Sequence, residues 1–231
     1  EPLLENARDL DQILIWEPTQ GQGGISLLRW SLRLRQEDFD WVIIFNPSKF
    51  FHLASFFAGI PTRVGYSRKA GRLLTHTLAD TKAQRDLHET QYNLELLELL
   101  QIPVTPAQLK LTVSQEQNQA LNQLLLSLSA QIKETAPIAI HPWTSNPTKS
   151  WPLEAFSELM TTLDQQGTPI WIIGGPEESL QPKFWKTHAA SHIHDLVGRI
   201  PLNLLPALLE RCQALVSNDS GPVHVAAAVS T

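Results

Sequence analysis

Short apolar runs alternate with amphipathic segments along the whole second half of this chain. The runs predict β-strands at residues 137–141, 169–174, 194–197 and 214–217. The segments between them predict helices at residues 152–166, 177–190, 201–211 and from 221 onward. Strict alternation predicts a parallel sheet with right-handed helical crossovers, because parallel neighbours cannot be joined by a tight turn. Ligands bind such sheets at the carboxyl ends of the strands.

The first half carries the same class of pattern in a less regular order. Apolar runs predict strands at residues 12–16, 40–45 and 63–66. Helical spacing of apolar side chains predicts helices at residues 24–35, 49–58, 88–100 and 115–132. We place the domain boundary between Ile132 and Pro137, after the long helix. The chain is therefore expected to hold two α/β domains, residues 1–134 and 135–231.

Composition narrows the class of protein. Of the 231 residues, 42% are hydrophobic and 18% are charged, which is typical of a soluble globular protein. The net charge of −5 and the lack of a basic block argue against nucleic acid as the main partner. The single cysteine, Cys212, excludes a disulfide framework and fits a reducing cytosol. No apolar run is long enough to span a membrane.

The most specific segment lies near the C-terminus, where an apolar run ends in a polar turn, residues 217–221, and a helix of small residues begins. The free N–H groups and the positive dipole end of such a helix suit a phosphate. Ser220 adds a hydroxyl, and Gly221 lets the backbone approach closely. Asp219 is expected to accept from sugar hydroxyls or to cap the helix. His224 is expected either to pack or cap, or to contact the ligand.

Two further polar loops follow predicted strands of the same sheet. Residues 141–152 combine the hydroxyl side chains of Thr144 and Ser145 with the cation of Lys149, which is suited to neutralising phosphate charge. Thr144 and Ser145 also fit ordinary turn positions. The other loop spans residues 174–178 and begins Gly-Gly-Pro; its Glu177 is either a ligand for hydroxyl groups or a carboxylate favoured by a helix N-terminus. Together the three loops predict a phosphate-binding site at one edge of the sheet.

A metal site is not expected. His192 and His194 alternate as on a strand, but the sequence offers no evident third ligand. The glycine-rich stretch at residues 21–24 follows a predicted strand, yet no lysine follows it as in a phosphate-binding loop.

At these residues the chain resembles glycosyltransferase family 9, the heptosyltransferases of lipopolysaccharide synthesis. In the second half the resemblance rests on Asn218-Asp219-Ser220-Gly221-Pro222-Val223-His224, on His141-Pro142 with Lys149-x-Trp151-Pro152, and on Gly174-Gly175-Pro176-Glu177. In the first half it rests on Phe39-Asp40, Arg63-Val64-Gly65-Tyr66, Leu74-Thr75-His76, and His88 with Tyr92. It implies a GT-B fold: two Rossmann-like domains with parallel sheets face a cleft, the acceptor on the N-terminal one and the nucleotide-sugar donor on the C-terminal one.

The resemblance also implies the chemistry: an inverting, metal-independent transfer from ADP-heptose to a lipopolysaccharide core or a related lipid-linked glycan, with no cofactor. Lys149 would neutralise the leaving diphosphate as the catalytic cation. The donor-binding residues would be Thr144, Ser145, Lys149, Glu177, Asp219, Ser220, Gly221 and His224. The acceptor implies a cytoplasmic enzyme at the inner membrane surface, and we expect a monomer. The first half also contains a basic segment, which either contacts an acidic acceptor or is an ordinary solvated loop. Its residues are Arg63, Arg68, Lys69 and Arg72.

The chain departs from the family pattern in three ways. It begins after the Gly-Asp loop that carries the family's catalytic base, so that base is expected upstream of Glu1. It stops at Thr231, before a further strand and closing helices, and Trp143 stands where the family often has a small residue. We therefore expect a fragment lacking both ends that does not catalyse transfer by itself. Two alternatives stay open: a sugar-nucleotide epimerase of the same fold, and a non-catalytic nucleotide-sugar-binding fragment.

Overall fold

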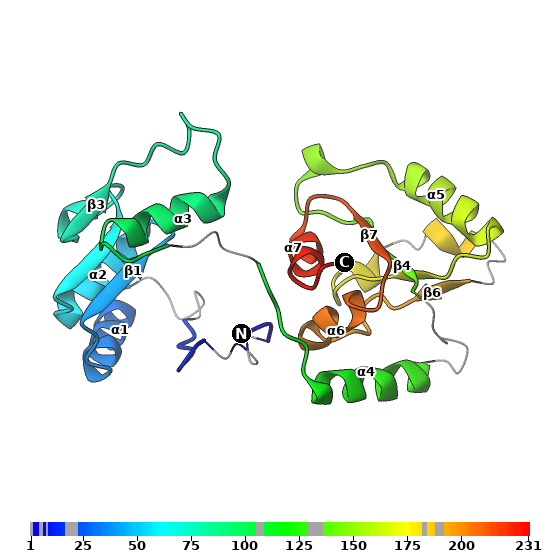
Figure 1. Ribbon diagram of the computed structural model, residues 1–231, viewed down its shortest axis with the longest axis horizontal. Coiled ribbons are helices and arrows are strands. Elements are labelled where there is room, and N and C mark those ends of the chain that lie inside the picture. Colours follow the sequence, from blue (N-terminus) through cyan, green and yellow to red (C-terminus); the bar gives the residue numbers. More distant parts are fainter. Residues whose placement is uncertain are drawn as a thin grey trace. The chain divides into compact units, whose positions relative to one another are not determined.

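The computed structural model describes residues 2–4, 7, 9–16, 23–104, 109–128, 136–181, 184–187 and 192–231. The chain divides into two compact units (Figure 1). The N-terminal unit comprises Ile15–Ala107, and the C-terminal unit comprises Glu1–Leu14 together with Gln108–Thr231.

This division corrects the boundary expected between Ile132 and Pro137. The helix α4 (Gln115–Leu128) belongs to the C-terminal unit, because Leu121 and Leu125 on its inner face are buried in that unit's core. Its Gln117 side chain also donates to the backbone oxygen of Asn203 at 2.6 Å. The remaining residues of the helix expected at 115–132 lie outside the described part of the chain.

The N-terminal unit contains a three-stranded parallel sheet in the order β1 (Trp41–Ile44), β2 (Thr62–Tyr66), β3 (His76–Leu78). Its helical elements are α1 (Gly24–Gln36), α2 (Lys49–Ala58), the 3-10 turn η2 (Gly71–Leu73) and α3 (Glu89–Glu98). Helices α1 and α2 pack on each other. Tyr92 and Leu96 of α3 pack against Val64 and Tyr66 of β2, as the helical spacing of the segment predicts.

The strand expected at residues 12–16 is not formed. The prediction is wrong because an apolar run becomes a strand only where a neighbour pairs with its N–H and C=O groups. Here Leu14 and Ile15 fall in different units, and Ile15 is 51% exposed. Trp16 instead packs its ring against Phe50 and Phe51 of α2, at centroid distances of 5.1 and 5.2 Å.

The C-terminal unit contains a four-stranded parallel sheet in the order β6 (Ile193–Asp195), β5 (Ile170–Ile172), β4 (Ile138–His141), β7 (Ala214–Ser217). This confirms the parallel sheet expected from the alternating pattern. His141 and Ser217 are paired at the carboxyl ends of β4 and β7, so the loops that follow these two strands leave the sheet side by side.

Helices cover both faces of this sheet, which Figure 1 shows with α4 and α6 together on one side and α5 on the other. The elements are η3 (Pro147–Lys149), α5 (Leu153–Gln165), η4 (Glu178–Leu180), η5 (Phe184–Thr187), η6 (Leu202–Leu204), α6 (Leu205–Leu209) and α7 (Gly221–Ala228). Alternate strand residues serve the two cores. Ala139 and Trp171 pack with α4, α6 and α7, whereas Ile140 and Ile172 pack with α5.

The helix expected at residues 177–190 is wrong. The structure has two short 3-10 turns there, η4 and η5. Pro182 stands between them in the sequence and has no N–H to continue a helical hydrogen-bond ladder. The helix expected at 201–211 is also shorter, because it opens as the 3-10 turn η6 before α6.

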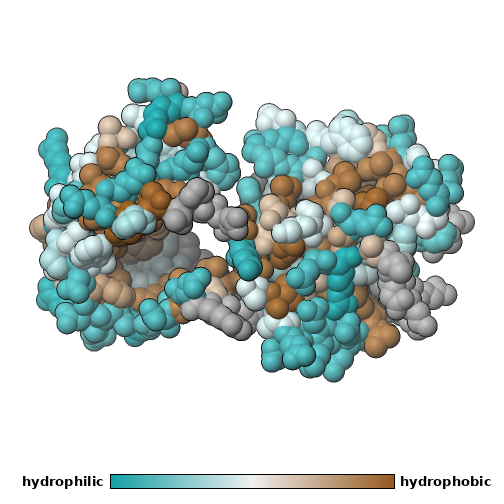
Figure 2. All heavy atoms as spheres, in the orientation of Figure 1, coloured by the Kyte–Doolittle hydropathy of each residue, from teal (hydrophilic) through white to brown (hydrophobic). Residues whose placement is uncertain are grey.

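Apolar side chains reach the surface of both units, visible as brown patches among polar atoms in Figure 2. The helical spacing of Ile25, Leu28 and Leu32 correctly predicts α1. These three side chains are nevertheless 73%, 60% and 50% exposed. The pattern therefore identified a helix, whereas its apolar stripe is not covered by the described residues.

Candidate functional site

A cleft of about 790 Å³ opens at the carboxyl edge of the C-terminal sheet. The loops after β4, β5 and β7 form its polar side, as expected for a parallel α/β sheet. Five of the residues predicted for the donor site line it: Thr144, Ser145, Glu177, Ser220 and Gly221. Apolar side chains from elsewhere in the unit line the cleft as well: Leu3, Ile173, Ile200, Leu202, Leu205 and Val225.

Asn218 joins the loops on either side of the cleft. Its side chain is 5% exposed, and its Nδ2 donates to the Pro142 backbone oxygen at 2.6 Å. Its Oδ1 accepts from the Trp151 backbone N–H at 2.8 Å. One amide therefore fixes both ends of the loop that carries Lys149 to the turn after β7.

Lys149 and Asp219 pair next to Thr144 of the cleft, although neither is itself a lining residue. The Lys149 ammonium forms an ion pair with the Asp219 carboxylate, and their side chains are 48% and 59% exposed. The hydrogen bond and charge of Lys149 hold the pKa of Asp219 below its ordinary value. Thr144 supports the same junction, since its hydroxyl donates to the Asp219 backbone oxygen at 3.3 Å. Asp219 does not cap α7, because the N-cap position belongs to Ser220.

Lys149 itself is oriented by a short turn of its own loop. Asn146 caps the turn η3 by accepting from the Thr148 backbone N–H at 3.1 Å, and Pro147 supplies the first turn residue. His224 lies on the first turn of α7, exposed and outside the cleft lining. Lys149 is the main cause that lowers the pKa of Asp219, and the charge of His224 acts in the same direction.

A buried polar cluster lies at the base of the cleft. His141, at the end of β4, is 6% exposed, and its Nδ1 lies 3.1 Å from Ser220 Oγ and 3.4 Å from Ser217 Oγ. Burial lowers the pKa of His141, and the negative charge of Glu178 opposes that shift. The imidazole is therefore neutral at pH 7.

Two carboxylates enter the cleft on the β5 side. Glu177 lines it as predicted, and the neighbouring Glu178 does so too. A Cβ on Gly175 would lie only 2.9 Å from Glu178 Oε2, so the Glu178 carboxylate lies directly over the glycine. The arrangement provides acceptors for ligand hydroxyl groups.

Trp143 forms part of the cleft wall. Its ring meets His141 and Trp185 edge to face, with centroids 5.8 Å apart in each case. A Cβ on Gly174 would lie 2.9 Å from Trp143 Cζ3, closer than packed atoms approach. Glycine at 174 is thus required by the bulk of Trp143, and the pair sets the shape of this wall.

The basic segment of the N-terminal unit is largely engaged internally. Arg63 donates to the backbone oxygens of Ile60 and Leu73, the latter at 2.7 Å, and Lys69 donates to the Pro47 oxygen at 2.6 Å. Arg68 pairs with Asp80 at 2.7 Å. These contacts favour the reading of Arg63 and Arg68 as residues that hold their own loops.

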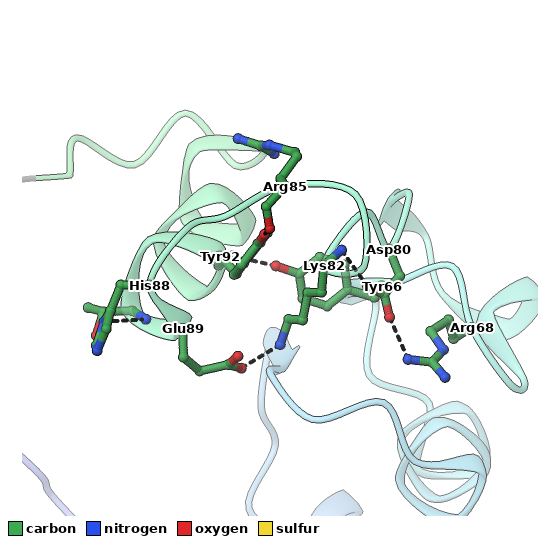
Figure 3. Close-up of polar contacts among 9 residues, drawn as sticks. Tyr66, Arg68, Asp80, Lys82, Arg85, His88, Glu89 and Tyr92 are labelled. Carbon is green, nitrogen blue, oxygen red and sulfur yellow. Dashed lines mark hydrogen bonds and ion pairs between the residues drawn. The ribbon is translucent and has the colours of Figure 1, made fainter. Parts of the chain in front are cut away.

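Figure 3 shows the network around that segment. Lys82 pairs with Glu89, and its ammonium lies 5.3 and 5.5 Å from the ring centroids of Tyr66 and Tyr92. The Tyr66 hydroxyl donates to the Tyr92 backbone oxygen at 2.5 Å, and burial is the main cause that raises the pKa of Tyr66 to about 12. The network fixes the chain before α3 onto that helix. His88 caps α3, which accounts for its place at the helix start.

Within the described residues, no three His, Cys, Asp or Glu side chains gather in a way that would hold a metal ion. His192 instead lies 3.1 Å from Asp164 Oδ1. In the part of the chain that the structure describes, no helix is both long enough and apolar enough to cross a membrane.

The sequence model of glycosyltransferase family 9 (heptosyltransferase) matches residues 27–231, which include the whole cleft loop set. The chain belongs to glycosyltransferase family 9. Lipooligosaccharide heptosyltransferase 2 of Haemophilus ducreyi is 27% identical over 185 residues, covering 76% of this chain and 53% of that protein. Lipopolysaccharide heptosyltransferase 2 of Escherichia coli is 28% identical over 210 residues, covering 85% of this chain and 59% of that protein. The chain thus spans little more than half the length of these relatives.

Solved structures of family 9 proteins share the fold. A family 9 glycosyl transferase from Veillonella parvula has a TM-score of 0.83 at 21% identity, over 99% of this chain and 66% of that one. The E. coli ADP-heptose lps heptosyltransferase II has a TM-score of 0.73 at 25% identity, over 99% of this chain and 70% of that one. The expected GT-B class, with two Rossmann-like α/β units and parallel sheets, is confirmed.

In this family 9 chain, sequence reasoning missed three residues of the site. His141 and Asn218 stand in the sequence segments that carry the family resemblance, yet their roles depend on contacts to residues far along the chain. Glu178 lies at the end of the polar loop expected at residues 174–178, but the sequence analysis assigned a role only to Glu177. Its position directly after Glu177 in the sequence was the signal that could have identified Glu178.

Proposed function

We propose that this protein is a heptosyltransferase that moves a heptose-like sugar from ADP-heptose to a lipopolysaccharide core or a related lipid-linked glycan. The observation that carries the proposal is the cleft of the C-terminal unit in a family 9 chain: it joins the N-terminus of α7 to hydroxyl, carboxylate and apolar side chains. Two relatives are named as enzymes of lipopolysaccharide or lipooligosaccharide heptose transfer.

The polar end of the cleft suits a diphosphate. Transfer from a nucleotide sugar builds negative charge on the leaving diphosphate, which needs a preorganised positive field. Lys149, whose partner Asp219 contacts the cleft residue Thr144, and the first turn of α7 at Gly221 supply that field from two loops. We propose that these groups do so without a metal ion or cofactor, and that the reaction inverts the anomeric centre.

The ion pair of Lys149 implies an exchange on binding. A phosphate that takes the Lys149 ammonium releases the Asp219 carboxylate, which can then accept from sugar hydroxyls. Glu177 and Glu178 supply acceptors for ribose hydroxyls, and Thr144 and Ser145 line the diphosphate end. The apolar side chains of the cleft offer a surface for a base, as nucleotide pockets do.

The acceptor belongs to the N-terminal unit in this proposal. A lipid-linked, acidic saccharide places the reaction at the cytoplasmic face of the inner membrane, with the protein acting as a monomer. Among the described residues, Arg68 is the cation of the basic segment that pairs with a carboxylate, whereas Arg63 and Lys69 donate to backbone oxygens.

Product analysis tests the proposal. The gene product that carries this sequence is incubated with ADP-heptose labelled in the sugar, with and without a lipopolysaccharide core that lacks heptose. A transferase moves the label to the core and leaves the donor unchanged without it. An epimerase converts the donor without any core. A binding protein does neither, and the last two outcomes overturn the proposal.

A further inference from the structure

The indole N–H of Trp143 is a hydrogen-bond donor without an acceptor in the described part of the chain. Trp143 lines the cleft, and its partly buried ring packs against the core on the α5 side of the sheet. Its Nε1 is not a buried atom, and no described residue accepts a hydrogen bond from it. Because an indole N–H can only donate, it requires an acceptor from solvent or from a ligand in the cleft.

The ring of Trp143 is held in one orientation by its neighbours. Its Cε3–Cζ3 edge lies against Gly174, where an added Cβ would be 2.9 Å from Cζ3 and 3.2 Å from Cε3. His141 and Trp185 meet the ring edge to face, with interplanar angles of 73° and 80°. In an indole the N–H lies on the edge opposite Cε3 and Cζ3, so this N–H points away from Gly174. A donor fixed in this way loses little conformational freedom when a ligand binds.

The ring of Trp143 lies near the residues that we assign to the diphosphate. Thr144 and Ser145 follow it directly in the chain and line the same cleft. His141 contacts the ring of Trp143, and its Nδ1 lies 3.1 Å from the Ser220 hydroxyl oxygen. The imidazole therefore links the indole to the turn after β7.

The chemistry of the N–H selects among the groups of a nucleotide. Ribose hydroxyls donate as well as accept, and the carboxylates of Glu177 and Glu178 suit them. Phosphate oxygens accept, and a hydrogen bond to a charged acceptor is about twice as strong as one between neutral groups. We propose that the indole N–H of Trp143 donates to a phosphate oxygen of the nucleotide sugar, which makes Trp143 a ligand-contacting residue of the donor site. This inference rests on the proposed function.

The direct test observes the indole N–H itself. In the proton–nitrogen correlation spectrum of the 231-residue chain, the indole signal that is missing from Trp143→Phe belongs to Trp143. We expect this signal to move downfield when ADP or inorganic pyrophosphate is added, and to stay in place with adenosine, which has no phosphate. Pyrophosphate carries no base, so its effect cannot come from an aromatic ring stacked on the indole.

Calorimetry measures the effect of the contact on affinity. Trp143→Phe keeps an aromatic ring in the wall but has no N–H, and we expect ADP to bind about tenfold more weakly and adenosine within about twofold of the parent. A residue that only shapes the wall would change the binding of both ligands alike. Trp41→Phe changes an exposed tryptophan of the N-terminal unit and should leave ADP affinity unchanged. If Trp143→Phe does not fold, as judged by circular dichroism, Trp143→Leu carries the same expectations.

The outcomes separate this inference from the proposed function. ADP binding that leaves the Trp143 signal in place overturns the inference, and so does a shift that adenosine reproduces or pyrophosphate does not. A Trp143→Phe chain that binds ADP as tightly as the parent also overturns it. If pyrophosphate moves the signal but ADP does not bind, the phosphate contact holds and the proposed function is wrong. A parent chain that binds neither ligand overturns both.

Discussion

The ammonium group of Lys149 is paired with the carboxylate of Asp219, although 70 positions separate the two residues in the sequence. The pair joins the loop after β4 to the turn after β7, which are neighbours because those strands are adjacent in the sheet. A free cation at this place would attract any anion, whereas a paired one favours a ligand that can replace a carboxylate. A diphosphate meets that requirement, and the exchange leaves Asp219 available to the sugar.

Substitution of Lys149 by alanine is predicted to weaken ADP binding by about ten- to a hundredfold, because a hydrogen bond from a charged group to phosphate contributes on the order of 1.5–3 kcal/mol. Calorimetry of the 231-residue chain measures this. In the transfer reaction the same loss should appear in kcat as well as in the donor KM, since leaving-group charge grows in the transition state. Lys110→Ala, at another exposed lysine of the same unit, is the matched control. If Lys149→Ala bound ADP as the parent does, Lys149 would be an ordinary surface lysine without a role in binding.

Asn218→Ala is predicted to destabilise the C-terminal unit by about 2–4 kcal/mol, because it leaves the Pro142 oxygen and the Trp151 N–H without partners. The loop that carries Lys149 also loses the hydrogen bonds that hold it to the turn after β7, so ADP affinity should fall. Urea unfolding followed by tryptophan fluorescence measures the first effect, and calorimetry the second. Gln213→Ala, at an exposed side chain, serves as the control. A stability change below about 0.5 kcal/mol would contradict the role given to this amide.

Gly174→Ala is predicted to cost about 1–3 kcal/mol, because the new Cβ would lie 2.9 Å from Trp143 and 3.1 Å from Val197. The double variant Gly174→Ala/Trp143→Leu should be less destabilised than the sum of the two single variants, since the smaller side chain makes room. A double-mutant cycle on unfolding free energies gives this coupling. Gly24→Ala is the control, since a Cβ there meets nothing within 4 Å. Additive effects of the two substitutions would mean that Trp143 does not require the glycine.

Stability of the N-terminal unit is predicted to fall as the pH decreases below about 6.5. His52 of α2 is fully buried, and burial, with a smaller contribution from the charge of Lys69, lowers its pKa from the ordinary value of 6.5. The unfolded chain then binds a proton at His52 at a pH where the folded chain does not, so protonation favours unfolding. The loss begins near pH 6.5 and continues down to the folded-state pKa; above pH 6.5 the effect is absent.

Urea unfolding between pH 5 and 8 measures this dependence in the parent and in His52→Leu, which should be less sensitive to acid. His76→Gln changes an exposed histidine of the same unit and should keep the sensitivity of the parent. Equal acid sensitivity in the parent and His52→Leu would refute the assignment to His52.

The sheet of the C-terminal unit could be predicted because its strands are buried on both faces. Residues such as Ala139 and Ile140 serve opposite cores, so each strand is an uninterrupted apolar run between polar loops. The start of helix α7 could also be predicted, since Gly221 and Pro222 mark its first turn. The helix expected at residues 177–190 was wrong because the prediction gave no weight to Pro182, a residue type with no N–H to continue a helical hydrogen-bond ladder.

The sequence predicts individual side chains of the site, but it does not predict the contacts among them. Lys149, Thr144 and Ser220 are visible in the sequence as residue types that suit phosphate. The amide of Asn218 and the imidazole of His141 act through partners more than 65 positions away, as the bonds to Trp151 and Ser220 show. Sequence spacing carries no record of such pairs. The predicted domain boundary was wrong because it also depends on contacts between distant residues: the packing of Leu121 and Leu125 assigns α4 to the C-terminal unit.

Nucleotide selectivity tests the central claim most directly, since it asks whether the cleft of the C-terminal unit is a site for an ADP-linked sugar. Calorimetric titration of the 231-residue chain with ADP and with UDP, under identical conditions, gives the two affinities. The account predicts one site for ADP, with UDP at least about tenfold weaker, corresponding to about 1.4 kcal/mol. A clear preference for UDP, or no binding of either nucleotide, would contradict it.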